Sequence, residues 1–128
     1  MFNTELHYSE IGIGTYLGDS NKVIDDRLLK VVEGAILKGI NLIDTAPNYR
    51  CERSEKVIGE ILNKIDRNKI VLSTKVGFLP FEKKEPQHYD QYFKDRFINS
   101  GIINIDNVYG DWQSFHPDYI EWQLNESL

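Results

Sequence analysis

The stretch Asn41-Leu42-Ile43-Asp44-Thr45-Ala46-Pro47-Asn48-Tyr49 decides the fold. Its short apolar run ends abruptly at the carboxylate of Asp44, and the phenol of Tyr49 follows five residues later. A lysine, Lys75, closes the next apolar run of the chain. Three side chains that can hold or release a proton therefore stand at, or just beyond, the predicted ends of two strands.

The sequence before this stretch predicts a strand and a helix. Ile11 to Thr15 alternates apolar residues with glycine, which indicates a short strand. The glycines fit either a close approach to a ligand or a tight turn, and no further glycine follows to complete a dinucleotide-binding turn. Asp25-Asp26 is expected to open a helix that ends near Gly39. Its predicted buried stripe comprises Leu28, Leu29, Val32, Ala35 and Ile36.

The sequence after the stretch repeats this order. Ser54 is the predicted cap of a second helix, whose apolar positions are Val57, Ile58, Ile61 and Leu62. Ile70 to Leu72 then forms a third strand, apolar throughout. Strands that alternate with helices across short connections favour parallel pairing, in a sheet covered on both faces. The predicted class is therefore α/β with about three βα units.

The character of the chain changes after Gly77. Residues 78–115 are rich in charged and aromatic side chains without a sustained period, and they are interpreted as a long loop insertion with short elements of its own. Ile102 to Ile105 is expected to be a small strand within it. Pro117 can occupy the first turn of a last helix. The apolar residues of that helix fall at four-residue spacing, at Ile120, Leu124 and Leu128.

Composition excludes several classes of protein. The 128 residues fit one domain, and a net charge of −5 without a basic stripe argues against nucleic acid as a partner. No apolar run approaches the roughly 20 residues that cross a bilayer, and Met1 to Glu5 lack a signal pattern. We therefore expect a soluble cytoplasmic protein that does not enter membranes. Cys51 is the only cysteine and has no second ligand at metal-site spacing, so no metal site is expected.

The polar groups are expected to meet at one edge of the sheet. In parallel α/β folds, ligands bind where the strands end at their carboxyl side. There, Asp44 would pair with Lys75, and the positive charge of the lysine would make the nearby phenol of Tyr49 a better proton donor to a carbonyl oxygen. Each residue also has a plain structural explanation: an Asp-Thr pair often caps or braces a loop, and a lysine at a strand end is often simply solvated.

Four blocks of sequence carry a resemblance to a known family. In chain order they are Ile11-Gly12-Ile13-Gly14-Thr15-Tyr16, then Gly39 to Tyr49, then Ser54-Glu55 with Gly59, and Ser73-Thr74-Lys75-Val76. Together they resemble the N-terminal part of an aldo-keto reductase, with order and spacing kept. The final stretch, 117–128, is similar to the helix that follows the third strand in that family. Residues 74–77 and the loop after them are similar to the branch that acts on sugars and small aldehydes.

The resemblance implies a fold, a reaction and residue roles. The fold would be the N-terminal portion of a TIM (β/α)8 barrel, with residues 1–128 as a partial domain. The reaction would be reduction of a small-molecule aldehyde or ketone with NADPH. By matching position, Tyr49 would be the general acid, Lys75 the residue that tunes it, and Asp44 the partner of Lys75. Gly14, Thr15 and Tyr16, together with Asp44, would contact the cofactor.

The resemblance is incomplete in two respects. The family's catalytic histidine has no counterpart: His7 and His88 lie in unmatched places, and His116 precedes Pro117, where capping or exposure is expected. The cofactor contacts of the later strands are also missing, since a full barrel needs about 250 residues. We expect a truncated chain, a segment completed by another chain, or a small open fold, and little or no turnover from this chain alone. The alternative is a non-catalytic half-barrel module for binding or assembly, which offers its exposed strand edges and aromatic loop to a partner; self-association through these edges is one such case.

Overall fold

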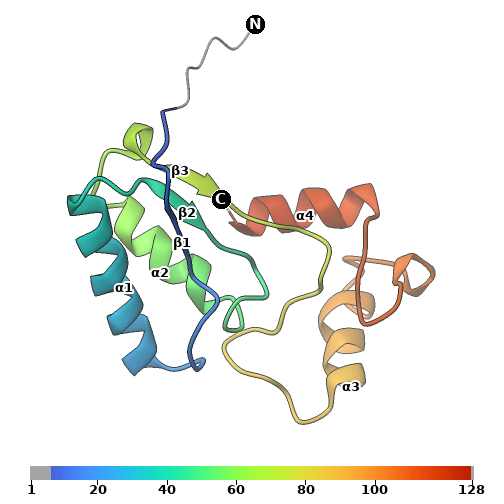
Figure 1. Ribbon diagram of the computed structural model, residues 1–128. Helices are drawn as coiled ribbons and strands as arrows, with labels where there is room; N and C mark the ends of the chain where they lie inside the picture. The colour runs from blue at the N-terminus through green and yellow to red at the C-terminus, as the bar shows by residue number, and fades with distance from the viewer. Residues whose placement is uncertain (1–6, 128) are drawn as a thin grey trace, which may run out of the picture.

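Three short parallel strands form the sheet of this protein, whose computed structural model describes residues 7–127 (Figure 1). They are β1 (Gly12–Gly14), β2 (Leu42–Asp44) and β3 (Val71–Ser73), in the order β1-β2-β3. The register places Gly14 beside Asp44 and Asp44 beside Ser73. The carboxyl ends of all three strands therefore meet at one edge, and the predicted α/β class with parallel pairing is confirmed.

The first helix, α1 (Lys22–Leu37), begins earlier than predicted. Asn21 is its N-cap, and the Asn21 side chain accepts a hydrogen bond of 3.0 Å from the backbone N–H of Ile24. Asp25 lies inside the first turn and does not open the helix, so that prediction is wrong. An asparagine that caps the first turn leaves the Asp25 carboxylate free for contacts across the molecule.

The end of α1 confirms the predicted role of Gly39. Gly39 has a φ of 88°, in the left-handed region that favours glycine. Its N–H donates to the carbonyl of Ile36, and the N–H of Ile40 donates to that of Ala35. These two bonds satisfy the last carbonyls of the helix and turn the chain towards β2.

The second helix, α2 (Arg53–Leu62), starts from an unusual turn. Arg50, Cys51 and Glu52 all have positive φ values, of 53°, 56° and 65°. This left-handed turn brings the chain into helical geometry at Arg53, so the prediction that Ser54 caps the helix is wrong. Ser54 is instead fully buried, and its hydroxyl donates a hydrogen bond of 2.7 Å to the carbonyl of Thr15.

The first hydrophobic core lies between the sheet and these two helices, which Figure 1 shows on the same side of the strands. Its buried members come from α1, β2, α2 and the residue just before β3; they are Val32, Ile43, Val57, Ile58, Ile61 and Ile70. Leu28, Leu29 and Ile36 pack against them. Each buried aliphatic side chain of this kind stabilises the fold by about 1.5–3 kcal/mol. The apolar stripes predicted for both helices are therefore confirmed as the faces that bury this core.

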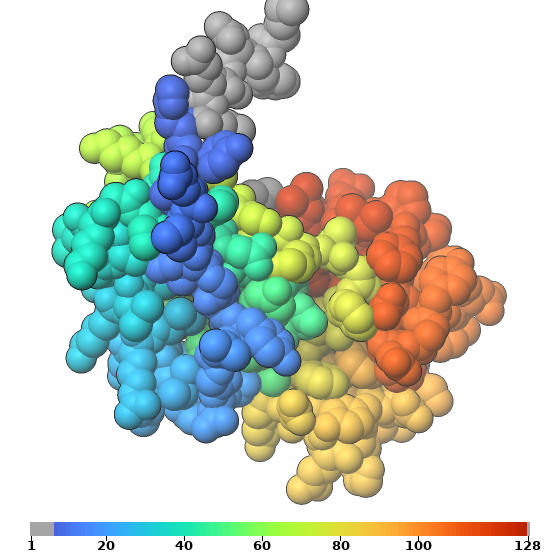
Figure 2. Space-filling view, viewed as in Figure 1, coloured from blue at the N-terminus to red at the C-terminus, as the bar shows by residue number. Residues whose placement is uncertain are grey.

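Residues 78–127 build a second core. This segment lies beside the sheet and its two helices (Figures 1 and 2). Its buried members are Leu79, Phe93, Phe97, Ile103 and Tyr119. The segment contains a short helix α3 (Tyr89–Phe93), which continues as a π-helical turn η2 (Lys94–Ile98). Two 3-10 turns complete the short elements of the chain, η1 (Arg67–Lys69) before β3 and η3 (Ile105–Asn107) after η2.

The predicted strand at Ile102 to Ile105 is wrong. Ile103 is buried in the second core, but the chain then enters the 3-10 turn η3. The side chain of Asn104 caps this turn by accepting a hydrogen bond of 3.0 Å from the N–H of Asp106. The local Asn-x-Asp turn chemistry therefore overrides the apolar run.

The last helix, α4 (Pro117–Ser127), begins at Pro117, as predicted. Its buried residues are Tyr119 and Gln123. Ile120 and Leu124, which carry the four-residue spacing, are 37% and 54% exposed, and Leu128 lies outside the described residues. The aromatic ring of Tyr119 thus anchors this helix, and its aliphatic residues leave much of their surface uncovered.

The cap at Gly39 supplies a test of the fold. We expect Gly39→Ala to lower the free energy of unfolding by about 1 kcal/mol, because a side chain at this φ is strained. Gly34→Ala, within α1, is the matched control and should raise it by roughly 0.5–1 kcal/mol, since alanine favours a helix interior. An added Cβ meets no atom within 4 Å at either position, so the two variants do not differ in steric packing. Urea denaturation measures the free energy of unfolding of both variants. A Gly39→Ala variant more stable than the wild type would contradict the role of Gly39 as the helix cap.

Candidate active site

The Asp44 and Lys75 side chains meet at the carboxyl edge of the sheet. Asp44 ends β2, and Lys75 lies two residues beyond β3. The Lys75 ammonium donates to Asp44 Oδ2 at 2.7 Å and to the backbone carbonyl of Thr45 at 2.9 Å. Both side chains are nearly half exposed, at 46% and 43%, so this pair contributes at most about 1 kcal/mol to stability. Its main effect is to fix where the ammonium lies.

Tyr49 lies directly against this ammonium. Lys75 Nζ is 4.6 Å from the centre of the Tyr49 ring, within the range of a cation–π contact. The ring of Tyr16 packs edge-on against Tyr49, with 5.2 Å between the ring centres. The fold therefore brings together four of the residues predicted for the site, namely Asp44, Tyr49, Lys75 and Tyr16.

The charge of Lys75 is well defined. Partial burial alone would lower the pKa of the Lys75 ammonium, but the hydrogen bond with the Asp44 carboxylate and the contact with the Tyr49 phenol outweigh this effect and raise it. Lys75 is therefore protonated at neutral pH. A fixed positive charge therefore lies against the ring of Tyr49.

Thr15 differs from the other predicted cofactor residues because it is buried. Its N–H donates to the carbonyl of Asp44, and its hydroxyl lies 2.9 Å from that of Thr45. Together with the bond from Ser54, these contacts tie the ends of β1 and β2 to α2. Gly14 and Tyr16 are exposed, and there is open space where a Cβ on Gly14 would lie. Gly14, Tyr16 and Asp44 can thus meet a ligand, whereas the Thr15 side chain holds the strand ends in place.

A buried ion pair that the sequence reading missed holds the loop around the site. The Arg50 side chain is only 1% exposed, and it donates to the Asp25 carboxylate at 2.6 Å. Arg50 also donates to the carbonyl of Asp19, and Arg53 pairs with the other oxygen of Asp25. Burial alone would raise the pKa of Asp25, but hydrogen bonds from Arg53 and Arg50 lower it overall. The signal available in the sequence was the pair of arginines so soon after Tyr49.

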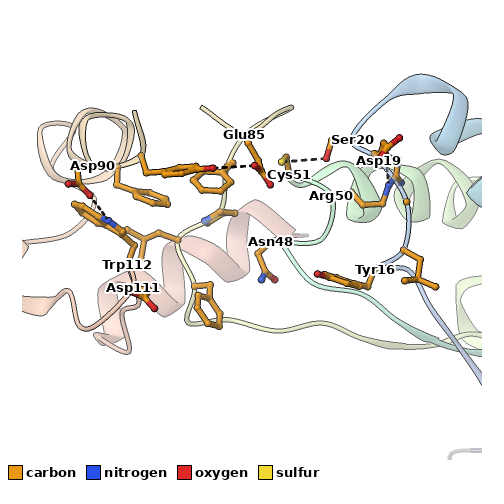
Figure 3. Close-up of a pocket in the computed structure, with 18 residues that line it drawn as sticks. Tyr16, Asp19, Ser20, Asn48, Arg50, Cys51, Glu85, Asp90, Asp111 and Trp112 are labelled. Atoms are coloured by element: carbon orange, nitrogen blue, oxygen red, sulfur yellow. Dashed lines mark hydrogen bonds between the residues drawn. The ribbon is translucent and has the colours of Figure 1, made fainter. Parts of the chain in front are cut away.

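Two cavities adjoin these residues. A smaller one, of about 300 Å³, is lined by Tyr49 and Lys75 together with Pro47, Asn48, Val76 and Phe78. A larger one, of about 760 Å³, lies between the loops that follow β1 and β2 and the segment 78–112 (Figure 3). Asn48 and Phe78 line both cavities. Tyr49 and Lys75 therefore border a space large enough for a small molecule.

The histidines of the second half lie apart from this site. His116 Nδ1 is 3.4 Å from the N–H of Asp118, in the first turn of α4, which agrees with the predicted capping role. His88 precedes α3. Neither histidine lines the cavity beside Tyr49. Within residues 7–127, no three His, Cys, Asp or Glu side chains are placed as a metal site requires.

Comparison with known proteins identifies the family. A model of the aldo/keto reductase family matches residues 10–128. The chain belongs to the aldo/keto reductase family. Its three parallel βα units are accordingly the N-terminal portion of a TIM barrel, as the sequence predicted.

The names and similarity of individual relatives support this family assignment. NADH-specific methylglyoxal reductase of Escherichia coli (strain K12) is 36% identical over 89% of this chain and 41% of its own length. The uncharacterized oxidoreductase YqkF of Bacillus subtilis (strain 168) is 27% identical over 98% of this chain and 40% of its own length. D-threo-aldose 1-dehydrogenase of Pseudomonas sp is 40% identical over 52% of this chain and 21% of its own length. The chain spans about two fifths of the length of the first two relatives.

The aldo/keto reductase segment contains a second acidic group near the strand ends. Glu55 of α2 accepts hydrogen bonds from the Thr74 hydroxyl at 2.5 Å and from the Ser127 hydroxyl at 3.3 Å. It therefore connects α2 to the end of β3 and to α4. Burial raises the pKa of Glu55, and the two hydroxyl donors offset only part of that effect.

Among residues 7–127, no helix has the length and apolar character to cross a membrane.

Glu55 predicts a pH dependence of stability. Because its pKa is higher in the folded state than in the unfolded chain, ionisation of Glu55 reduces stability as pH rises from the ordinary glutamate value through the raised one. Glu55→Gln keeps an acceptor for Thr74 but cannot ionise. We expect this variant to gain free energy of unfolding relative to the wild type between about pH 4 and pH 7. Denaturation at several pH values measures the difference in free energy of unfolding between Glu55→Gln and the wild type. A difference that does not change with pH would contradict the raised pKa of Glu55.

Proposed function

We propose that this segment supplies the acid-base residues of a carbonyl reductase that uses a nicotinamide cofactor. The single observation that carries the proposal is the placement of the Lys75 ammonium, bonded to Asp44 and set over the ring of Tyr49. Asp44 orients Lys75, and Lys75 stabilises the phenolate of Tyr49 electrostatically. Tyr49 then donates its proton to the carbonyl oxygen of the substrate while hydride adds to the carbon.

The residues at the strand ends fit such a cofactor. Open space lies over Gly14, the ring of Tyr16 is exposed, and Lys75 bonds to only one of the two carboxylate oxygens of Asp44. These groups would lie against the nicotinamide and its ribose hydroxyls. When bound, a nicotinamide dinucleotide supplies the hydride. The resemblance favours NADPH, whereas the name of the Escherichia coli relative favours NADH, so both belong in the assay.

The proposed substrate is a small carbonyl compound. The names of two relatives, a methylglyoxal reductase and an aldose dehydrogenase, support small aldehydes and sugars. The cavity of about 300 Å³ beside Tyr49 has the size for such a molecule. The reaction would yield the alcohol and the oxidised cofactor.

The variant Tyr49→Phe tests the proposed role of the phenol. It keeps the ring between Tyr16 and Lys75 but removes the proton that is donated, so we expect kcat to fall by about 100-fold or more. Cofactor affinity should change little, because the ring contacts remain. Oxidation of NADPH and NADH with methylglyoxal and small aldoses measures the rate, with the segment joined to the remaining strands of a family barrel, because little or no turnover is expected from residues 1–128 alone. Tyr8→Phe, at an exposed position away from the site, is the control. A Tyr49→Phe variant that works at the wild-type rate would contradict the proposal.

A non-catalytic assembly module is the second candidate, and one observation favours it. In the described part of the chain, β1 and β3 each pair only with β2, so each has an unpaired edge. Ile11 is exposed just before β1. Under this alternative the chain forms a dimer through the edge of β1, and Ile11→Lys weakens the dimer by placing like charges together. Sedimentation equilibrium measures the mass over a range of concentrations, and a monomer throughout would rule out self-association through this edge.

A further inference from the structure

The larger cavity has two walls from distant parts of the chain (Figure 3). One wall contains Tyr16 and Asp19 after β1, and Asn48 after β2. The other belongs to the segment 78–112. Its volume of about 760 Å³ falls within the range of small-molecule sites in proteins.

The wall from segment 78–112 is a continuous stack of aromatic rings. Tyr89 stacks on Phe81 with 5.2 Å between ring centres, Phe81 on Phe93 at 5.1 Å, and Phe93 on Trp112 at 4.8 Å. Trp112 has a φ of 57°, a strained backbone for so large a residue, and its indole N–H donates to Asp90 at 3.2 Å. Such strain persists only where the surrounding contacts enforce it, so the indole is held firmly in this wall.

Carboxylates dominate the charge around the same cavity. Four acidic residues line it, and they are Asp19, Glu85, Asp90 and Asp111. The bonds of Glu85 and Asp90 come from neutral donors, the hydroxyl of Tyr89 and the indole of Trp112. Within residues 7–127, none of the four forms a salt bridge. Among the described residues, no salt bridge therefore offsets the charge of these four carboxylates.

Arg50, which shares the Asp25 carboxylate with Arg53, is the only cation among the described residues of the lining. It pairs with Asp25 at 2.6 Å and donates to the carbonyl of Asp19, with a side chain that is 1% exposed. Because the Arg50 side chain is almost fully buried, a ligand in the cavity meets mainly aromatic and apolar side chains and carboxylates. The carboxylates attract a positive charge, and the aromatic and apolar side chains favour an apolar body.

We propose that this cavity binds small organic cations, namely amines or quaternary ammonium compounds with an apolar body. The aromatic stack would cover the apolar body, and the carboxylates would face the cationic group. Asn48 and Phe78 line both this cavity and the smaller one beside Tyr49. If the proposed function holds, and this step rests on it, the preferred substrates are carbonyl compounds that carry a positive charge, and carboxylate-bearing ones are disfavoured.

Fluorescence of Trp112 reads out binding without any turnover. Trp122 packs in the second core against Phe97 and Tyr119, away from the cavity, so Trp122→Phe leaves Trp112 as the only tryptophan. The probes are benzyltrimethylammonium, benzyl alcohol and benzoate, which share a ring and differ in charge. We expect the cation to bind at least about tenfold more tightly than either other probe, with an affinity that falls as salt is added.

Neutral variants of the acidic lining test the source of this preference. Asp19→Asn with Asp111→Asn should weaken binding of the cation by roughly fivefold and leave benzyl alcohol unchanged. Both positions are exposed, so circular dichroism should show an intact fold. Glu121→Gln, on the exposed surface of α4 and outside the cavity, is the control and should change nothing.

Two outcomes would overturn the proposal: equal affinity for the three probes, or tight cation binding that the double variant leaves unchanged. Because no cofactor or substrate is present, this experiment is independent of the role of Tyr49. Cation binding together with an active Tyr49→Phe variant would refute the proposed function alone. Loss of cation selectivity together with an inactive Tyr49→Phe variant would refute only the cation site.

Discussion

The contact between Arg50 and Asp25 is the constraint on which the loops of the site depend. Arg50 belongs to the turn after Tyr49, whereas Asp25 belongs to α1, and the same guanidinium also holds the carbonyl of Asp19 in the loop after β1. One buried side chain thus gathers two βα loops. Because the Arg50 side chain is almost fully buried, loss of Asp25 would leave an unpaired charge inside the protein, at a cost of about 3 kcal/mol or more. The ion pair with Asp25 therefore stabilises the left-handed backbone conformation at Arg50.

The same turn connects the two hydrophobic cores. The carbonyl of Cys51 accepts the N–H of Lys83 at 3.1 Å, and the carboxylate of Glu52 accepts from Arg96 at 2.6 Å. Arg96 lies in η2, within the second core region, and only partly exposed. The turn between Tyr49 and α2 is therefore held from both sides, by α1 and by the segment 78–127. This explains how three successive residues other than glycine keep a conformation that would otherwise be costly.

Local patterns in the sequence predicted the first half of the molecule well. Apolar runs that end in polar residues placed β2 and β3, and Gly39 placed the end of α1, because these signals depend only on near neighbours. The start of α2 was misplaced because the turn at Arg50 to Glu52 is stabilised by distant partners, Asp25 and Arg96. The second core was missed for the same reason, since the rings of Phe93, Phe97 and Tyr119 meet only after the chain has folded back on itself. The candidate site was predictable because its residues follow directly from strand ends.

At the carboxyl edge of the sheet, the side chains that stabilise the fold differ from those proposed to carry the chemistry. The buried hydroxyls of Thr15, Thr45 and Ser54, with the backbone bonds beside them, hold the strand ends in register. The Asp44 and Lys75 pair lies half exposed in front of them and adds little to the free energy of folding. Its position is therefore not explained by stability. A half-exposed charged pair set against the ring of Tyr49 and beside a cavity is the arrangement that the proposed transfer of a proton to a bound molecule requires.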